Sequence, residues 1–463
     1  MSEMNPRYPV DGRKRQTLIA AGVIFLLVFL KPLHAQGDNL TYRDAVHDAI
    51  KQSSRLRVKQ AEIEISEASY KQSLSHLYPG LSLNSRLERF ETLTKDGEIR
   101  TIYGQVIGGD VDEWRSSVYL AGEYLLSNWY KKGYHAKYYR ELVDDARFDA
   151  QVESKKLVLD VTGIYSALSE SFIKIRYEGE IVGKLREAVT LRKKAYESGE
   201  ISHEEYLKSE AALAAAEKDQ SADRMQLRQN LARLSALTGR DYSGDIYIEP
   251  IPQGAVSLTG EIMKDVEGMP EYKYRQKEKD ALQHKATASR NDFFPDVGIY
   301  GRYDFYGNRS DLSNALHDME EVSYNAGVFL SIPLFDGFAR KWERQKVLRE
   351  IKRQEETIQS LKSEKVKELE ALHAGLSEQA RTVEHYRKIA ARYRQVLGIA
   401  RGAKLLGERN VVDIAETEKE ALSIERDLKV AENAMAAIEK KLFIESDYRN
   451  FMREYHGNGS DIH

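Results

Sequence analysis

The 463-residue sequence predicts an α+β membrane protein that combines four transmembrane β-strands with long antiparallel coiled-coil α-helices. Three observations support this fold class. Both halves of the chain present the same order of parts: a helical stretch, a proline-led strand, a second strand and a very long helical pair. Four segments alternate apolar and polar side chains with a period of two. Two stretches, 80–249 and 334–463, contain no proline and permit helices far longer than the globular average of about a dozen residues.

The two halves repeat each other at nearly constant spacing. Pro79 opens the first strand of one half, and Pro295 opens its counterpart 216 residues later. Farther along, residues 196–219 align with 404–427 at an offset of 208. Offsets that differ by one or two helical turns indicate duplicated units that have drifted in length.

This duplication predicts a first structural repeat over 36–256 and a second over 257–463, each with a long helical hairpin. The hairpin tips are expected near Gly199 and Gly407, which align with each other. Glycine adopts the backbone angles that a tight reversal needs, whereas other side chains penalise them. A helix kink at these glycines is the alternative.

Residues 1–35 have the features of a secretory signal peptide. Basic residues precede the apolar run TLIAAGVIFLLVFL, and Leu33-His34-Ala35 forms a plausible cleavage end. A membrane-spanning helix needs about 20 apolar residues, so this 14-residue run is short for an uncleaved anchor, which is the alternative. We expect cleavage after Ala35.

Cysteine is absent from the chain, and the formal net charge is −3. Without disulfides, stability must come from packing and assembly, and no lipid can be attached to an N-terminal cysteine. The charge balance gives no indication of nucleic-acid binding. Outside residues 1–35 no apolar stretch reaches 18 residues, so a mature chain that spans a membrane would do so with strands.

Strands are expected at about 81–90, 115–126, 296–306 and 322–332, each with an apolar and a polar face. A tilted transmembrane strand needs about 9 to 11 residues of this kind. A soluble sheet with one solvated face would show the same alternation. Tyrosines at the strands and strand ends favour the membrane, because aromatic girdles mark its interfaces. They are Tyr300, Tyr303, Tyr306 and Tyr324.

Four strands cannot close a barrel, and open sheet edges are not tolerated in hydrocarbon. The sequence therefore predicts an oligomer. The polar segments 91–113 and 307–321 lie between the strands of each pair. We expect them to be extracellular loops.

The helices are expected to be rods. Residues 339–406 contain no proline, and roughly 65 residues at about 1.5 Å per residue give a helix near 100 Å long. Apolar residues at spacings of three to seven predict the stripe of an antiparallel coiled coil. They are Ile351, Ile358, Leu361, Val366, Leu369, Leu372 and Leu376.

Two phrases carry a family resemblance: IPLFDG (332–337), where a strand passes into a long helix, and GERNVVDIAE (407–416), at the second hairpin tip. With the export signal and the duplicated strand pairs, they resemble the TolC-type outer-membrane efflux family, the outer membrane factors. The similarity covers nearly all of the mature chain. The chain departs from the family pattern in two places. The first half has Ser127-Asn128-Trp129 at the position where the second half has Pro333-Leu334-Phe335. Segment 49–58 lacks the proline that is usual at its helix break.

The resemblance implies a homotrimer in which each protomer gives four strands to one twelve-stranded β-barrel and helices to an α-helical barrel that forms a periplasmic tunnel. It implies location in the outer membrane of a Gram-negative cell, in contact with outer membrane lipid. The implied function is the exit duct of a tripartite efflux or type I secretion system. The implied partners are a periplasmic adaptor protein and an inner-membrane transporter of the RND or ABC type.

The resemblance also assigns candidate residues at the periplasmic entrance. Arg409 and Glu205 match a pair that holds the tunnel shut, and Asp413 and Glu416 match acids that ring the constriction. Gly199 and Gly407 mark the hairpin tips that would contact the adaptor. An Arg–carboxylate bond between helices could act as a latch, and acids on a narrow axis would favour cations. The alternative is that all four charges are ordinary exposed side chains.

No catalytic, cofactor or metal-binding motif emerges from the sequence. The histidines lack metal-ligand spacing, and no P-loop or dinucleotide fingerprint is present. We therefore expect no enzyme and no cofactor. Two rival interpretations are a periplasmic coiled-coil adaptor (membrane fusion) protein of an efflux pump and a coiled-coil scaffold. Neither would need detergent to stay soluble.

Overall fold

The computed structural model describes most of the chain after the predicted signal peptide. The described residues are 39–90, 99–100, 106–107, 113–242, 246–252, 254, 265–309, 311–317, 319–405 and 411–456. The predicted signal peptide, 1–35, lies outside them.

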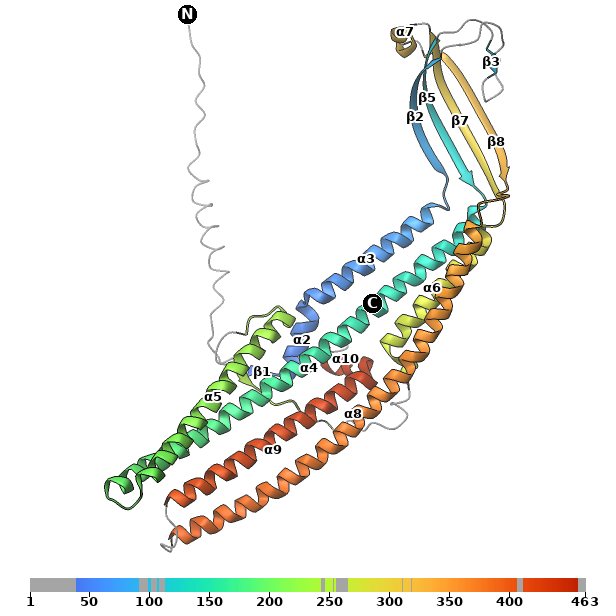
Figure 1. Cartoon of the computed structure of the whole chain (residues 1–463). Helices are drawn as coiled ribbons and strands as arrows, with labels where there is room; N and C mark the ends of the chain where they lie inside the picture. The colour runs from blue at the N-terminus through green and yellow to red at the C-terminus, as the bar shows by residue number, and fades with distance from the viewer. Residues whose placement is uncertain are drawn as a thin grey trace, which may run out of the picture.

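The molecule is elongated, with a β-sheet at one end and long helices running from it to two hairpin ends (Figure 1). The first half contains α3 (Ser54–Ser75), β2 (Gly80–Phe90), β5 (Glu113–Leu125), α4 (Asn128–Glu197) and α5 (His203–Thr238). The second contains α6 (Pro270–Asn291), β7 (Asp296–Arg309), β8 (Glu321–Ser331), α8 (Ala339–Leu405) and α9 (Val411–Ser446). The order helix, strand, strand, helix, helix therefore occurs twice.

The four long strands form one antiparallel sheet in the order β2-β5-β7-β8. Its register places the apolar faces of all four strands on the same side. One row across the sheet joins Leu83 to Leu120, Leu120 to Tyr303 and Tyr303 to Tyr324. Leu83 is 73% exposed and Tyr324 is 82% exposed. The expected strands are confirmed, and together they present a continuous apolar surface to the outside of the chain.

Polar side chains occupy the opposite face of the sheet. Arg302 forms an ion pair with Asp304 and lies 3.6 Å from the ring centre of Tyr119 on the neighbouring strand. Asn84 donates a hydrogen bond to Ser82 on the same strand. The alternation expected from the sequence thus separates two chemically different surfaces.

The connection between the second pair of strands differs from the expected plain loop over 307–321. Strand β7 continues to Arg309, because β5 begins at Glu113 and the register pairs Trp114 with Arg309. A short helix, α7 (Leu312–His317), follows, with Ala315 buried against the sheet. In the first connection, β3 (Ile99–Arg100) and β4 (Val106–Ile107) pair with each other.

The IPLFDG phrase forms the passage from β8 into α8. Gly337 and Phe338 have φ values of +65° and +68°, in the left-handed region that favours glycine. The Asp336 carboxylate accepts hydrogen bonds from the backbone N–H of Arg340 and, at 2.6 Å, from its Nε. The Arg340 guanidinium also donates to the carbonyl oxygen of Asp292. The phrase therefore turns the chain and fixes the start of α8.

The helix break in segment 49–58 needs no proline. Helix α2 (Tyr42–Gln52) ends at Ser53, whose φ of −60° and ψ of 127° are extended rather than helical. Helix α3 begins at the next residue. One extended residue is enough to redirect the chain.

The main apolar core lies midway along the helices. Strand β1 (Asn39–Leu40) pairs in parallel with β6 (Tyr247–Ile248), and Leu40 and Ile248 pack in this core. The Tyr42 hydroxyl bonds to Thr162 at 2.8 Å, and the Tyr165 hydroxyl donates to the carbonyl oxygen of Leu40 at 2.7 Å. The last helix, α10 (Tyr448–His456), adds a fully buried Phe451. Buried hydroxyls are therefore satisfied inside an apolar core.

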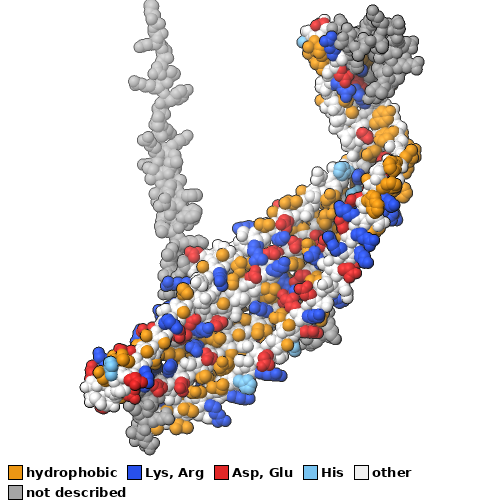
Figure 2. All heavy atoms as spheres, in the orientation of Figure 1, with side chains coloured by type: hydrophobic (Ala, Val, Ile, Leu, Met, Phe, Trp, Pro, Cys, Tyr) orange, Lys and Arg blue, Asp and Glu red, His pale blue; other side chains and the backbone are white. Residues whose placement is uncertain are grey.

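The predicted apolar stripe of α8 packs against its neighbours. Leu369 is buried together with Leu442 of α9. Val266, in the 3₁₀ helix η2 (Val266–Gly268), and Met269, directly after that helix, complete the same cluster. Outside the packed seams, acidic and basic side chains are interspersed along the helices (Figure 2). Within the described part of the chain, none of the helices is both long and apolar enough to cross a membrane.

Candidate functional site at the hairpin ends

The first hairpin reverses at Gly199. Helix α4 ends at Glu197, and Gly199 has a φ of +79°. The backbone N–H of Glu200 donates to the carbonyl oxygen of Ala195 at 2.8 Å, which closes the last turn. Ser202 then caps α5 by accepting a hydrogen bond from the backbone N–H of Glu205. Glycine is needed here because a side chain would strain the left-handed backbone.

Aromatic side chains stiffen this end. Tyr196 and Tyr206 stack with ring centres 5.7 Å apart and planes only 6° from parallel. The ring centre of His203, the first residue of α5, lies 5.0 Å from that of Tyr196. The Tyr206 hydroxyl donates to Glu210 one turn farther along α5. These contacts hold the ends of α4 and α5 together around the turn.

The structure brings only some of the predicted entrance residues into view. Gly407 and Arg409 lie outside the described residues, between α8 and α9. Asp413 belongs to α9, but its side chain is also outside the described part. Glu205 is exposed in the first turn of α5. The predicted bond between Arg409 and Glu205 therefore stays a prediction.

Glu416 has a partner that the sequence did not suggest. Its Oε1 lies 2.6 Å from Nη2 of Arg192, on α4 of the other hairpin. The two residues border a small cavity of about 150 Å³ between the hairpins, together with Ala188, Ser209 and Ala415. The candidate constriction acid is thus part of the contact between hairpins.

A second bridge lies close by. Glu418 on α9 accepts from Lys184 on α4 at 3.2 Å and from Arg401 on α8 at 2.8 Å. Burial raises the pKa of Glu418, but the hydrogen bonds from the two cations outweigh it, so the pKa lies below its ordinary value. Three helices of the two hairpins converge on this carboxylate.

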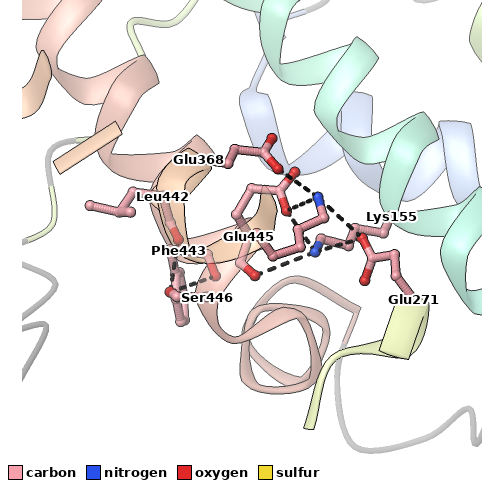
Figure 3. A network of polar contacts seen from close by, with 8 residues as sticks. Lys155, Glu271, Glu368, Leu442, Phe443, Glu445 and Ser446 are labelled. Atoms are coloured by element: carbon pink, nitrogen blue, oxygen red, sulfur yellow. Dashed lines mark hydrogen bonds and ion pairs between the residues drawn. The ribbon is translucent and has the colours of Figure 1, made fainter. Parts of the chain in front are cut away.

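A buried ionic cluster joins the long helices nearer the core (Figure 3). Lys155 on α4 is 1% exposed, and its Nζ lies 2.7 Å from Glu445 on α9 and 2.9 Å from Glu271 on α6. Lys365 on α8 lies 3.2 Å from Glu445 and 2.7 Å from Glu368. The Lys155 ammonium therefore joins α4 to α6 and α9, and the Lys365 ammonium joins α8 to α9.

Arg192, Lys184 and Arg401 were missed because sequence spacing does not reveal their partners. Arg192 and Glu416 are 224 positions apart, so no local period connects them. The sequence does show many charged residues on the helix faces. Ordinary solvated helices show the same pattern, so it does not single out these residues. Among the described residues, no group of three or more histidines and carboxylates is placed to hold a metal ion.

A sheet with one continuous apolar outer face, carried on long paired helices, defines a membrane protein with a large helical extension. The chain belongs to the outer membrane efflux protein family, whose family model matches residues 45–240 and 271–443. This confirms the resemblance inferred from the sequence. The family is one of efflux proteins rather than enzymes.

Solved structures share the fold at low sequence identity. VceC, an outer membrane protein of Vibrio cholerae, is 14% identical with a TM-score of 0.72, covering 88% of this chain and 95% of its own. The CmeC outer membrane channel of Campylobacter jejuni is 14% identical with a TM-score of 0.72, covering 91% and 87%. CusC is 14% identical with a TM-score of 0.71, covering 90% and 95%. No curated protein sequence matches the chain.

Proposed function

We propose that the protein is the outer-membrane exit duct of a tripartite efflux or type I secretion system. The observation that carries this proposal is the register of the sheet, which aligns four apolar strand faces into one outward surface. Lipid-facing strands of a transmembrane barrel need such a surface, with polar residues on the lumen side. The helical hairpins would continue the duct into the periplasm.

The proposed assembly is a homotrimer. In the four-stranded sheet, β2 and β8 are the outer strands. They run antiparallel to each other, because three antiparallel pairings separate them. The β8 strand of one protomer can therefore pair with β2 of the next, and three copies would close a twelve-stranded barrel without an edge in hydrocarbon.

Mass measurement in detergent tests this proposal. We expect a stable species with three times the chain mass and loss of solubility when detergent is removed. A stable monomer, or a species that stays soluble without detergent, contradicts the proposal. The second outcome would favour the periplasmic adaptor, although an adaptor has no use for a continuous apolar sheet face.

The remaining assignments extend the same proposal. Residues 1–35 would be removed on export, and the repeats 36–256 and 257–463 would each contribute two strands and one hairpin. The hairpin ends at Gly199 and Gly407 would meet a periplasmic adaptor, which in turn joins an inner-membrane transporter. Because the Glu205 carboxylate is exposed at this end, it is accessible to a cation such as Arg409.

A further inference from the structure

A cleft of about 660 Å³ lies between the two helical hairpins, on the core side of the bridges described above, and all four long helices line it. Most of its charged side chains are acidic. The titratable and charged groups that line it are Lys174 and Glu178 on α4, Asp219 and Asp223 on α5, Tyr386 on α8, and Arg426 and Asp427 on α9.

Glu178 is the buried group of this cleft. It is only 7% exposed, and its Oε1 lies 3.5 Å from Nη1 of Arg426. Its Oε2 is buried, and no hydrogen-bond donor among the described residues reaches it. Its hydrogen-bonding neighbour on α5 is the carboxyl group of Asp223. Two carboxyl groups bond to each other only when one of them carries a proton.

The cations in the cleft do not remove this requirement. Arg426 also binds Asp427 at 2.9 Å, and Lys174 binds Glu170 at 2.8 Å. Burial, together with the hydrogen bond and the negative charge of Asp223, raises the pKa of Glu178 to about 7, although the positive charge of Arg426 opposes the shift. The ordinary value for glutamate is 4.5.

We propose that Glu178 and Asp223 form a proton-dependent contact that holds α4 against α5 beside the cleft, and that rising pH releases it. With the proton present, the pair forms a hydrogen bond between the two helices. With the proton lost, two carboxylates face each other and a buried charge has only a shared arginine as partner.

The sign of the pH dependence follows from the raised pKa. We call the form with α4 and α5 in contact closed and the form with these helices separated open. In the open form Glu178 returns to an ordinary pKa, so the closed form binds more protons between about pH 4.5 and pH 7. The contact is therefore strongest at acid pH and is lost as the pH rises through about 7. Between pH 6 and pH 8 the ratio of the closed to the open population should fall about tenfold.

Hydrogen–deuterium exchange of the full-length protein in detergent tests the inference. Peptides around Glu178 and Asp223 should lose about tenfold in protection between pH 6 and pH 8, after correction for the intrinsic pH dependence of exchange. The variants Glu178→Gln and Asp223→Asn should abolish this difference, since an amide donates the hydrogen bond at any pH. Glu217→Gln removes an exposed ion pair with Arg186 between the same two helices and should leave the difference unchanged.

Wild-type protein without a pH difference in these peptides would overturn the inference, as would an unchanged difference in both amide variants. If Glu178→Gln fails to fold, Asp223→Asn alone decides. The measurement concerns contacts within one chain, so a failure here leaves the proposed duct function intact. Conversely, a protein that proved to be monomeric would still show the expected exchange.

Discussion

Arg192 on α4 and Glu416 on α9 lie 2.6 Å apart and connect the two helical hairpins close to their ends. Glu416 is 56% exposed, so the pair itself contributes little to stability, typically less than about 1 kcal/mol. Its importance lies in position. Any motion that separates the hairpins at this end must first break this contact and the neighbouring bridge through Glu418.

Removing the proposed latch should open the entrance. In Arg409→Ser the guanidinium that would hold Glu205 is lost, and we expect a higher single-channel conductance in planar-bilayer recordings. Arg381→Ser is the matched control, because Arg381 pairs with Glu378 on an exposed face of α8. Equal conductance of wild type and Arg409→Ser would make Arg409 an ordinary surface charge.

The acids near the entrance should set ion preference. Asp413→Ala combined with Glu416→Ala should weaken the preference for cations, since three copies of each carboxylate would be lost from a narrow axis. Arg192→Ala should strengthen the preference, because it removes the cation next to Glu416. Reversal potentials in a salt gradient measure both effects. Wild-type values in both proteins would show that these charges do not line the conducting path.

The hairpin ends should contact an adaptor in cells. The chain has no cysteine, so a single introduced cysteine reports one position without background. Ser198→Cys, beside the tip glycine, should crosslink to the adaptor hairpin. Ser310→Cys, in a proposed extracellular loop, should not. Crosslinking from the second site alone would reverse the proposed orientation of the protein in the membrane.

The outer face of the sheet should reject charge, whereas the inner face should accept it. Val328→Arg places a guanidinium on the apolar face, where a basic residue near the bilayer midplane costs about 2–4 kcal/mol. Ser323→Arg is the control, since Ser323 is five positions away on the polar face, where the register pairs it with Asp304. We expect a reduced fraction of membrane-assembled protein only for the first variant. Equal assembly would argue for a solvated outer face.

The buried cluster around Lys155 should be the most sensitive ionic site. Lys155→Met leaves Glu271 and Glu445 with less compensation, and breaking a buried pair costs about 3–5 kcal/mol. We expect a loss of unfolding free energy near the lower end of this range, because Lys365 still lies 3.2 Å from Glu445. Guanidinium-induced unfolding followed by tryptophan fluorescence measures the loss. Lys218→Met, at an exposed pair with Asp219, should change stability by less than about 1 kcal/mol.

The same cluster should make stability fall in acid. Burial raises the pKa of Glu271, but the charge and hydrogen bond of Lys155, together with the charge of Lys365 and a backbone hydrogen bond, outweigh it, so the pKa lies below the ordinary 4.5. A depressed carboxyl pKa adds stability above the unfolded value, and this stability is lost as the pH falls through the folded one. Wild-type protein should therefore lose more stability below about pH 4.5 than Lys155→Met. A parallel decline in both proteins would assign the effect to other carboxylates.

Local rules predicted the strands and the first turn well, because they depend on neighbouring residues. Alternation identified the lipid-facing candidates before their pairing was known, and Gly199 lies where the chain reverses. The Arg192–Glu416 bridge and the Glu178–Asp223 pair depend instead on how long helices are rotated against each other. A rotation of one residue, about 100° in a 3.6-residue turn, would separate either pair, and no single-sequence period fixes it.

The shared register of the four strands limits where the two halves could diverge. A slip of one residue inside a strand would turn every side chain to the other face. The helices after the tips, α5 and α9, have kept the same length of 36 residues, whereas the connections between paired strands span 91–112 in one half and 310–320 in the other. These connections are therefore the natural insertion points for an epitope or affinity tag, because added length there leaves the pairing of the strands untouched.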